Sequence, residues 1–152
     1  MTLYQSRRLR HGRHTAANQI YLVTANIAER QPLLANFHAA RTVIRGMRRL
    51  DAEMRVSSMA FVIMPDHLHW LFSLHPGNQL SDIMRLLKGR AARELNMRRL
   101  ANGTIWQSSF HDHALRREEN IQDAARYIIA NPVRAGLVKS VREYPHWDAV
   151  WL

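Results

Sequence analysis

Two histidines, His67 and His69, stand one residue apart directly after a Pro-Asp turn. In a β-strand, residues i and i+2 project from the same face, so both imidazoles would point to one side. Two convergent imidazoles form half of a divalent-metal site when a third ligand comes from elsewhere in the fold. Coincidence is the alternative, because the chain contains nine histidines and a second pair occurs at His111 and His113. Spacing alone leaves both interpretations open.

A tyrosine and an asparagine, Tyr127 and Asn131, lie four residues apart at the end of a segment with helical periodicity. On a helix, positions i and i+4 are neighbours, so the phenol and the carboxamide would lie one turn apart. Such a pair could supply a nucleophile and a metal ligand. Amphipathic packing of the tyrosine and a helix stop before Pro132 explain the same residues without chemistry. Taken alone, the two residues favour this second explanation.

Positive charge dominates the composition, since 22 Lys and Arg stand against 12 Asp and Glu and give a formal net charge of +10. Such an excess attracts polyanions, so nucleic acid or an anionic membrane surface is the expected class of partner. A basic helix face that is merely solvated is the usual alternative, but the chain has few acidic residues to neutralise its clusters of basic residues. The residues that we expect to contact phosphates lie in an N-terminal arm, residues 1–18, and in a helix before residue 100: Arg7, Arg8, Arg10 and Arg13 in the arm, and Arg85, Lys88, Arg90 and Arg93 in the helix.

Several classes of site are missing from the sequence. The chain has no cysteine, which excludes disulfides, thiolate metal sites and a cysteine nucleophile. It has no Gly-rich phosphate loop, no Gly-x-Ser-x-Gly elbow and no helical His-Glu-x-x-His pair. No apolar run approaches the ~20 residues that span a bilayer, so we expect a soluble intracellular protein with no membrane partner.

The predicted elements follow the order β-α-β-β-α-β, with one more helix behind them. They cover residues 20–24, 33–50, 56–64, 67–74, 81–100, 104–115 and 118–130. The third and fourth of these segments would pair as a hairpin through the Pro-Asp turn. This order predicts an α+β, ferredoxin-like fold with a four-stranded antiparallel sheet, in which the additional C-terminal helix carries Tyr127. We expect a single domain over residues 1–152, with residues 139–152 as a C-terminal tail.

Four segments agree in order and spacing with one known pattern. They run from Val62 to Leu71, from Ile105 to Arg116, from Tyr127 to Val138 and from Tyr144 to Leu152. The first contains Pro-Asp-His-Leu-His, which is similar to the HUH motif of the single-tyrosine transposases. In this combination the chain resembles the REP-associated tyrosine transposases, a group within that superfamily. The likeness covers nearly the whole chain from about Arg13.

The resemblance implies a role for the main site residues. His67 and His69 would hold a divalent cation, Mg²⁺ or Mn²⁺, and Tyr127 would be the catalytic nucleophile. Asn131 stands where related insertion-sequence transposases carry a glutamine as third metal ligand, although asparagine is one methylene shorter. Three more residues in the matching segments complete the predicted site, with His113 as a possible site neighbour and Arg116 and Arg134 as DNA contacts.

The resemblance also implies the reaction and the partner. Attack by the tyrosine would nick single-stranded or hairpin DNA at REP-type palindromes, leaving a 5′-phosphotyrosine and a free 3′-hydroxyl that can rejoin strands. The protein would act as a monomer or a homodimer in the bacterial cytoplasm, associated with the nucleoid.

Two other functions compete with this strand-transferase hypothesis. The first is a non-catalytic nucleic-acid-binding regulator on the same fold, which would be indifferent to chelation of metals. The second is a metal-dependent hydrolase that uses water on phosphodiesters and leaves no protein–DNA adduct. All the named catalytic positions are present, which favours the enzyme over an inactive copy.

Overall fold

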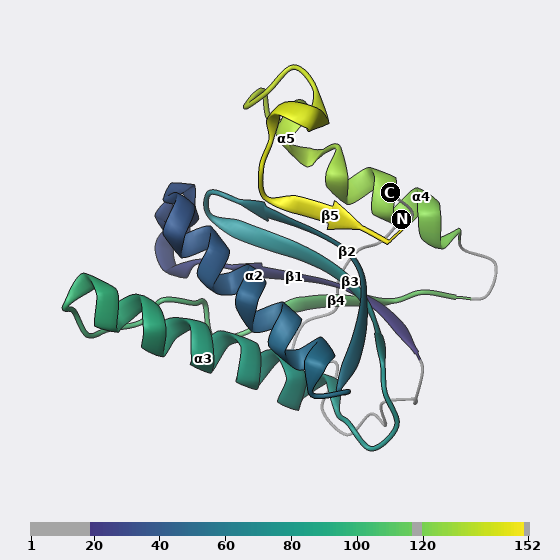
Figure 1. The fold of residues 1–152 in the computed structure, drawn as a ribbon, viewed down its shortest axis with the longest axis horizontal. Helices are drawn as coiled ribbons and strands as arrows, with labels where there is room; N and C mark the ends of the chain where they lie inside the picture. Colours follow the sequence, from purple (N-terminus) through teal and green to yellow (C-terminus); the bar gives the residue numbers. More distant parts are fainter. Residues whose placement is uncertain (1–18, 117–119, 151–152) are drawn as a thin grey trace.

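An open antiparallel sheet with helices on both faces organises the chain (Figure 1), in a computed structural model that describes residues 19–116 and 120–150. The sheet has the strand order β4-β1-β3-β2-β5, and every neighbouring pair is antiparallel. Its strands are β1 Ile20–Asn26, β2 Val56–Met64, β3 His67–Leu74, β4 His111–Ala114 and β5 Trp147–Ala149. The predicted ferredoxin-like α+β class is confirmed by the order of the first four strands.

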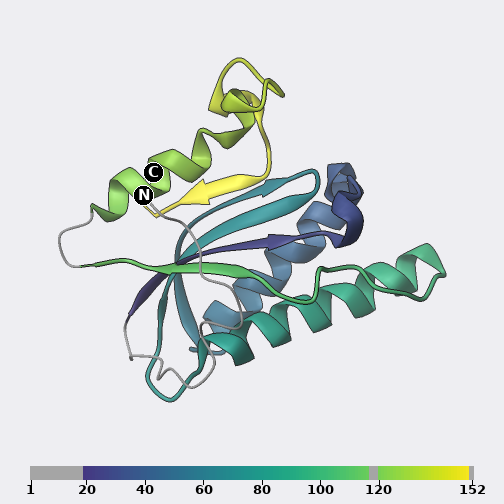
Figure 2. The same cartoon turned by 180° about the vertical axis from the view of Figure 1, so that it is seen from behind.

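Strand β3 lies at the centre of the sheet and separates two apolar cores. Leu68, Trp70, Phe72 and Leu74 are fully buried beneath α2 Phe37–Ala52 and α3 Leu80–Arg99. Leu71 belongs to the second core, on the opposite face, beneath α4 Ile121–Ile129. Figures 1 and 2 show α2 and α3 together on one side of the sheet and α4 on the other. Alternation along one strand therefore divides its side chains between two helical layers.

Helix α4 docks on the sheet through small and apolar side chains. Ala124, Ala125 and Ile128 are buried against β2 and β3, at the i, i+1, i+4 spacing of one helix face. The side chain of Asn120 caps the helix by accepting a hydrogen bond of 3.1 Å from the backbone N–H of Asp123. This docking determines where Tyr127, the neighbour of Ile128, lies relative to the sheet.

Several element boundaries differ from the sequence prediction, and two of them differ most. The helix expected from residue 33 begins at Phe37, because Leu33–Ala35 form a 3-10 turn and Asn36 caps the helix that follows. The strand expected over residues 104–115 is regular only over His111–Ala114. Its first part bonds to the end of β1 instead, where the N–H of Gln107 donates to the carbonyl of Asn26 at 2.9 Å.

The C-terminal region contains more structure than the sequence predicts. After α4 the chain continues into a short helix, α5 Asn131–Arg134, with Pro132 in its first turn, where a missing backbone N–H costs no hydrogen bond. Residues 139–152, expected to be a tail, include the turn η3 Val141–Glu143 and the strand β5, which pairs with β2. The sheet therefore has five strands rather than four. Across the described residues, every helix is too short or too polar to span a bilayer.

We expect Ile128→Ala to lower the free energy of unfolding by about 2–4 kcal/mol, because a fully buried side chain between α4 and the sheet is lost. Arg126→Ala is the matched control on the exposed side of the same helix, where about 1 kcal/mol or less depends on an ion pair with Asp123. Urea denaturation followed by circular dichroism measures both variants. Equally small effects would contradict the docking of α4.

Candidate active site

Strand β3 places His67 and His69 side by side on the face of the sheet that α4 covers. Their ring centroids lie 4.9 Å apart with an angle of 82° between the ring planes. Both side chains alternate with Leu68 and Trp70, which point into the opposite core. The expectation that the two imidazoles converge on one face is confirmed.

Each histidine has its Nδ1 atom engaged by a neighbour. Nδ1 of His67 lies 2.7 Å from Oδ1 of Asp66, and Nδ1 of His69 lies 2.7 Å from Oγ1 of Thr24. An ionised carboxylate only accepts, so His67 donates from Nδ1, and in the neutral ring the lone pair lies on Nε2. The Thr24 hydroxyl can accept a proton from Nδ1 of His69 or donate to it, so this contact is compatible with the same tautomer without imposing it. Nε2 is therefore the nitrogen through which each ring can bind a ligand.

The protonation state of His69 also suits metal binding. Burial lowers the pKa of His69 to about 3, and repulsion from His67 and Arg134 acts in the same direction. At neutral pH this ring is therefore uncharged, which is the form that binds a metal. Burial raises the pKa of the Asp66 carboxyl, but hydrogen bonds from His67 and Arg30 outweigh it and hold the pKa below its usual value.

Tyr127 lies near the end of α4 with its side chain 47% exposed. The guanidinium carbon of Arg134 sits 4.2 Å from the centroid of the phenol ring, and a terminal nitrogen donates to the carbonyl of Tyr127 at 2.6 Å. The same nitrogen donates to Oδ1 of Asn131. A single arginine thus holds the tyrosine and the carboxamide together at the junction of α4 and α5.

The two groups of residues share one face of the sheet. Helix α4 contacts β2 and β3, and α5 contacts β2. The positive charge of Arg134 lowers the pKa of His69, in agreement with this shared face. The structure therefore places the main residues predicted to carry chemistry on one face of the sheet: His67 and His69 from β3, Tyr127 from α4, and Asn131 from α5.

A metal bound to the two histidines would need a third ligand that is not a His, Cys, Asp or Glu side chain of the described residues. Within residues 19–116 and 120–150, no group of three or more His, Cys, Asp or Glu side chains is placed to hold a metal ion. Oδ1 of Asn131 is a hard oxygen donor on α5, which contacts β2, the strand next to β3. This oxygen accepts from Arg134 in the structure, so binding a metal requires it to change partner.

The predicted DNA contacts on α3 lie away from the histidines, because α3 covers the opposite face of the sheet. Arg90 donates to both carboxylate oxygens of Glu53, at 2.9 and 3.1 Å. Lys88 donates to the carbonyl of Gln107 at 2.7 Å, and Arg85 lies 3.5 Å from Asp82. Arg93 is exposed. DNA contact by these residues stays a prediction, and it would be made from the far side of the sheet.

The remaining predicted site residues are four arginines near the N-terminus, His113 and Arg116. Arg7, Arg8, Arg10 and Arg13 belong to residues 1–18, outside the described residues. His113 lies on β4 opposite Leu22, which in turn pairs with Leu71, so His113 shares the α4 face but stands two strands from β3. Arg116 is exposed, two residues beyond the end of β4.

Three site residues escaped the sequence analysis. Thr24 and Asn26 on β1 lie directly across from His69 and His67, so only the strand register reveals them. Arg30, in the turn η1 Ala28–Arg30, donates from Nε to Oδ2 of Asp66 at 2.9 Å. No pattern along the chain marks these residues, because the residue that each one faces or contacts is distant in sequence.

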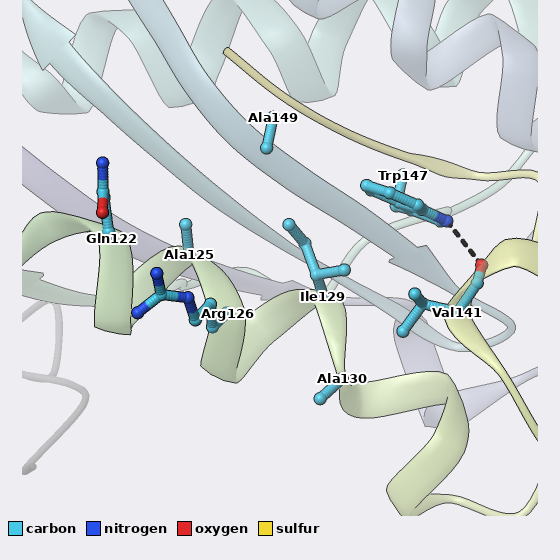
Figure 3. Close-up of a pocket in the computed structure, with 8 residues that line it drawn as sticks. All are labelled: Gln122, Ala125, Arg126, Ile129, Ala130, Val141, Trp147 and Ala149. Atoms are coloured by element: carbon cyan, nitrogen blue, oxygen red, sulfur yellow. Dashed lines mark hydrogen bonds between the residues drawn. The ribbon is translucent and has the colours of Figure 1, made fainter. Parts of the chain in front are cut away.

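A pocket of about 490 Å³ lies beside α4, between this helix and the C-terminal segment (Figure 3). The indole N–H of Trp147 donates to the carbonyl of Val141 at 2.8 Å along its wall. The lining residues are Gln122, Ala125, Arg126, Ile129, Ala130, Val141, Trp147 and Ala149. None of them is a predicted site residue, and most are apolar, so this pocket is separate from the histidine and tyrosine site.

Comparison with known proteins agrees with this arrangement. The REP-associated tyrosine transposase of Escherichia coli K12 is 28% identical over 128 residues, which cover 82% of this chain and 73% of that protein. The ISDra2 transposase TnpA of Deinococcus radiodurans is 29% identical over 70 residues, which cover 42% of this chain and 50% of that one.

A solved structure has the same fold. It shows a REP-associated tyrosine transposase bound to a REP hairpin, with a TM-score of 0.76 and 23% identity, and the match covers 97% of this chain and 82% of that chain. The resemblance inferred from the sequence motifs is confirmed. The family model described as "Transposase IS200 like" matches residues 16–131, a span that includes both histidines and Tyr127. The chain therefore belongs to the IS200-like transposase family.

Proposed function

We propose that this transposase nicks and rejoins single-stranded, hairpin-forming DNA through a covalent bond between Tyr127 and a 5′ phosphate. The observation that carries the proposal is the placement of Tyr127 on the same face of the sheet as His67 and His69. The relatives support the choice of substrate, since one is named for its association with REP elements and a structural neighbour is bound to a REP hairpin. The net charge of +10 favours a polyanionic partner.

The residues of the site fit a divalent metal, Mg²⁺ or Mn²⁺. Both histidines have Nδ1 engaged and Nε2 available, and burial keeps His69 neutral. His67 and His69 would bind the ion through Nε2, and Asn131 through Oδ1. When bound, such an ion would neutralise charge on the scissile phosphate and on the leaving oxygen.

Tyr127 would supply the nucleophile. Its hydroxyl oxygen forms a bond to phosphorus and loses its proton, while the bond from phosphorus to the 3′ oxygen breaks and that oxygen takes up a proton. One phosphate ester replaces another, so a 3′-hydroxyl can reverse the step without an outside source of energy. Arg134 lies against the phenol ring and restrains its orientation for this attack.

A single strand suits the position of the tyrosine. The phenol is partly exposed at the end of a helix that packs on the sheet, with Arg134 beside it. An unpaired strand can bend to present one phosphate at this position, and exposed aromatic and arginine side chains can stack on its bases.

We expect Tyr127→Phe to abolish the covalent adduct, with a loss of at least about a thousandfold, because the nucleophilic oxygen is removed while the ring beneath Arg134 stays. The substrate is a hairpin oligonucleotide labelled at its 3′ end, so that the fragment joined through its 5′ phosphate moves with the protein on a denaturing gel. DNA affinity should stay within about twofold in a filter-binding assay.

Tyr144→Phe is the matched control, since its hydroxyl donates to the carbonyl of Ile63 in the sheet. This variant should retain the adduct. An adduct formed by Tyr127→Phe would disprove the tyrosine mechanism, and cleavage by the unmodified protein without any adduct would instead indicate a hydrolase.

We expect EDTA, which removes the proposed ion, to reduce adduct formation by at least about a hundredfold. The double variant His67→Ala with His69→Ala, which removes two of the proposed ligands, should cause a reduction of the same size. DNA binding should persist. His75→Ala is the control, as its ring contacts Ser57 at 2.6 Å rather than the site, and it should react normally. Full activity in EDTA would exclude the metal, and a protein that binds hairpins but never reacts would be the non-catalytic regulator.

A further inference from the structure

The turn that follows β1 has an unusual backbone. Glu29 and Arg30 are consecutive residues in the left-handed region, with φ values of 56° and 53°. Residues other than glycine adopt this conformation at a cost in free energy, and they keep it where the surrounding structure imposes it. A pair of such residues in sequence therefore indicates that contacts around this turn hold it in place.

Contacts with the β2–β3 turn supply this constraint. On one side of Arg30, the N–H of Ile27 donates to the carbonyl of Asp66 at 2.9 Å. On the other side, the N–H of Leu34 donates to the carbonyl of Pro65 at 2.8 Å. The segment from Ile27 to Leu34, which contains this turn, is thus bonded at both ends to the two residues that precede the first histidine.

This backbone arrangement brings Arg30 to the carboxylate of Asp66. Nε of Arg30 lies 2.9 Å from Oδ2, and the other oxygen, Oδ1, lies 2.7 Å from Nδ1 of His67. A terminal nitrogen of Arg30 also lies 3.4 Å from Nδ1. An arginine nitrogen can only donate, and the carboxylate can only accept, so the shorter contact decides that the proton on Nδ1 points to Asp66.

We propose that Arg30 is a positioning residue, which acts through Asp66 to fix His67 in the tautomer that carries its proton on Nδ1. The Nε2 lone pair then faces the side of the sheet where Tyr127 lies. The use of that lone pair for a metal rests on the proposed function, but the tautomer itself requires neither metal nor DNA.

Arg30 is needed because the Asp66 carboxylate alone can adopt several orientations. A carboxylate on a turn can rotate and present either oxygen, in several directions, to an imidazole. The bond from Arg30 occupies Oδ2 and leaves Oδ1 aimed at His67. The second histidine lacks such a restraint, since the Thr24 hydroxyl beside His69 can either donate or accept. A fixed tautomer in this site therefore depends on the Arg30–Asp66 pair.

Nuclear magnetic resonance of protein labelled with ¹⁵N in histidine tests the tautomer directly. In the unmodified full chain, the His67 nitrogens should report a proton on Nδ1 only, with the signals assigned by their loss in His67→Ala. Arg30→Ala should give a mixture of tautomers, and Arg30→Lys should restore most of the original state. Asp66→Asn is a second variant, because its amide can donate to Nδ1 and should shift the proton to Nε2.

Arg45→Ala is the matched control. Arg45 forms an ion pair of 2.8 Å with Glu94, and its side chain is 50% exposed, against 52% for Arg30. Removal of this distant pair should leave the His67 signals unchanged. A pure Nδ1–H state in Arg30→Ala, with the thermal melting temperature of the unmodified protein, would overturn the proposal.

Binding of Mn²⁺, followed by electron paramagnetic resonance without DNA, is the second readout. The dissociation constant should rise about tenfold in Arg30→Ala, in the range found for residues that orient a metal-binding histidine, and stay within about twofold in Arg45→Ala. If the unmodified protein bound no Mn²⁺ while Arg30→Ala still changed the tautomer, the proposed metal would be wrong and the positioning role would stand. If Arg30→Ala bound Mn²⁺ with the affinity of the unmodified protein and kept the same His67 tautomer, the role of Arg30 would be refuted.

Discussion

The alternation of side chains along β3 is the constraint on which the site depends. Leu68 and Trp70 are fully buried against α2 and α3, so His67 and His69 have to point to the opposite face. Pairing with β1 on one side and β2 on the other holds this register. A slip by one residue would turn both imidazoles into the core and expose the apolar side chains, at a large cost in buried area. Packing of the core thereby determines the direction of the histidines.

The two faces of the sheet serve different purposes. The α2 and α3 face is closed by a large apolar core, and ion pairs such as Arg45 with Glu94 and Arg90 with Glu53 link its outer surface. The α4 face carries the site, where small residues of the helix allow it to lie close to the strands. Part of the positive charge therefore stabilises contacts between elements, and Arg134 is placed instead against the tyrosine.

Much of the fold was predictable, because the order of elements follows from local periodicity. The strand-turn-strand unit over residues 56–74 and the helix that carries Tyr127 are each marked by neighbouring residues alone. The strand Trp147–Ala149 was not predictable, since three residues show no periodicity and their strand conformation depends on pairing with β2. The start of α2 at Phe37 likewise depends on the Asn36 cap and on the turn before it.

For the site, the sequence by itself determined which residue types could do chemistry and that His67 and His69 share a face, because a two-residue period is a local property. Only the tertiary structure decided what surrounds them. Thr24 contacts a histidine 45 positions away, and Arg30 bonds an aspartate 36 positions away, so no window along the chain could reveal either pair. The same holds for α3, whose basic residues lie beyond the sheet from the site, since the face a helix covers is chosen by the packing of the whole chain.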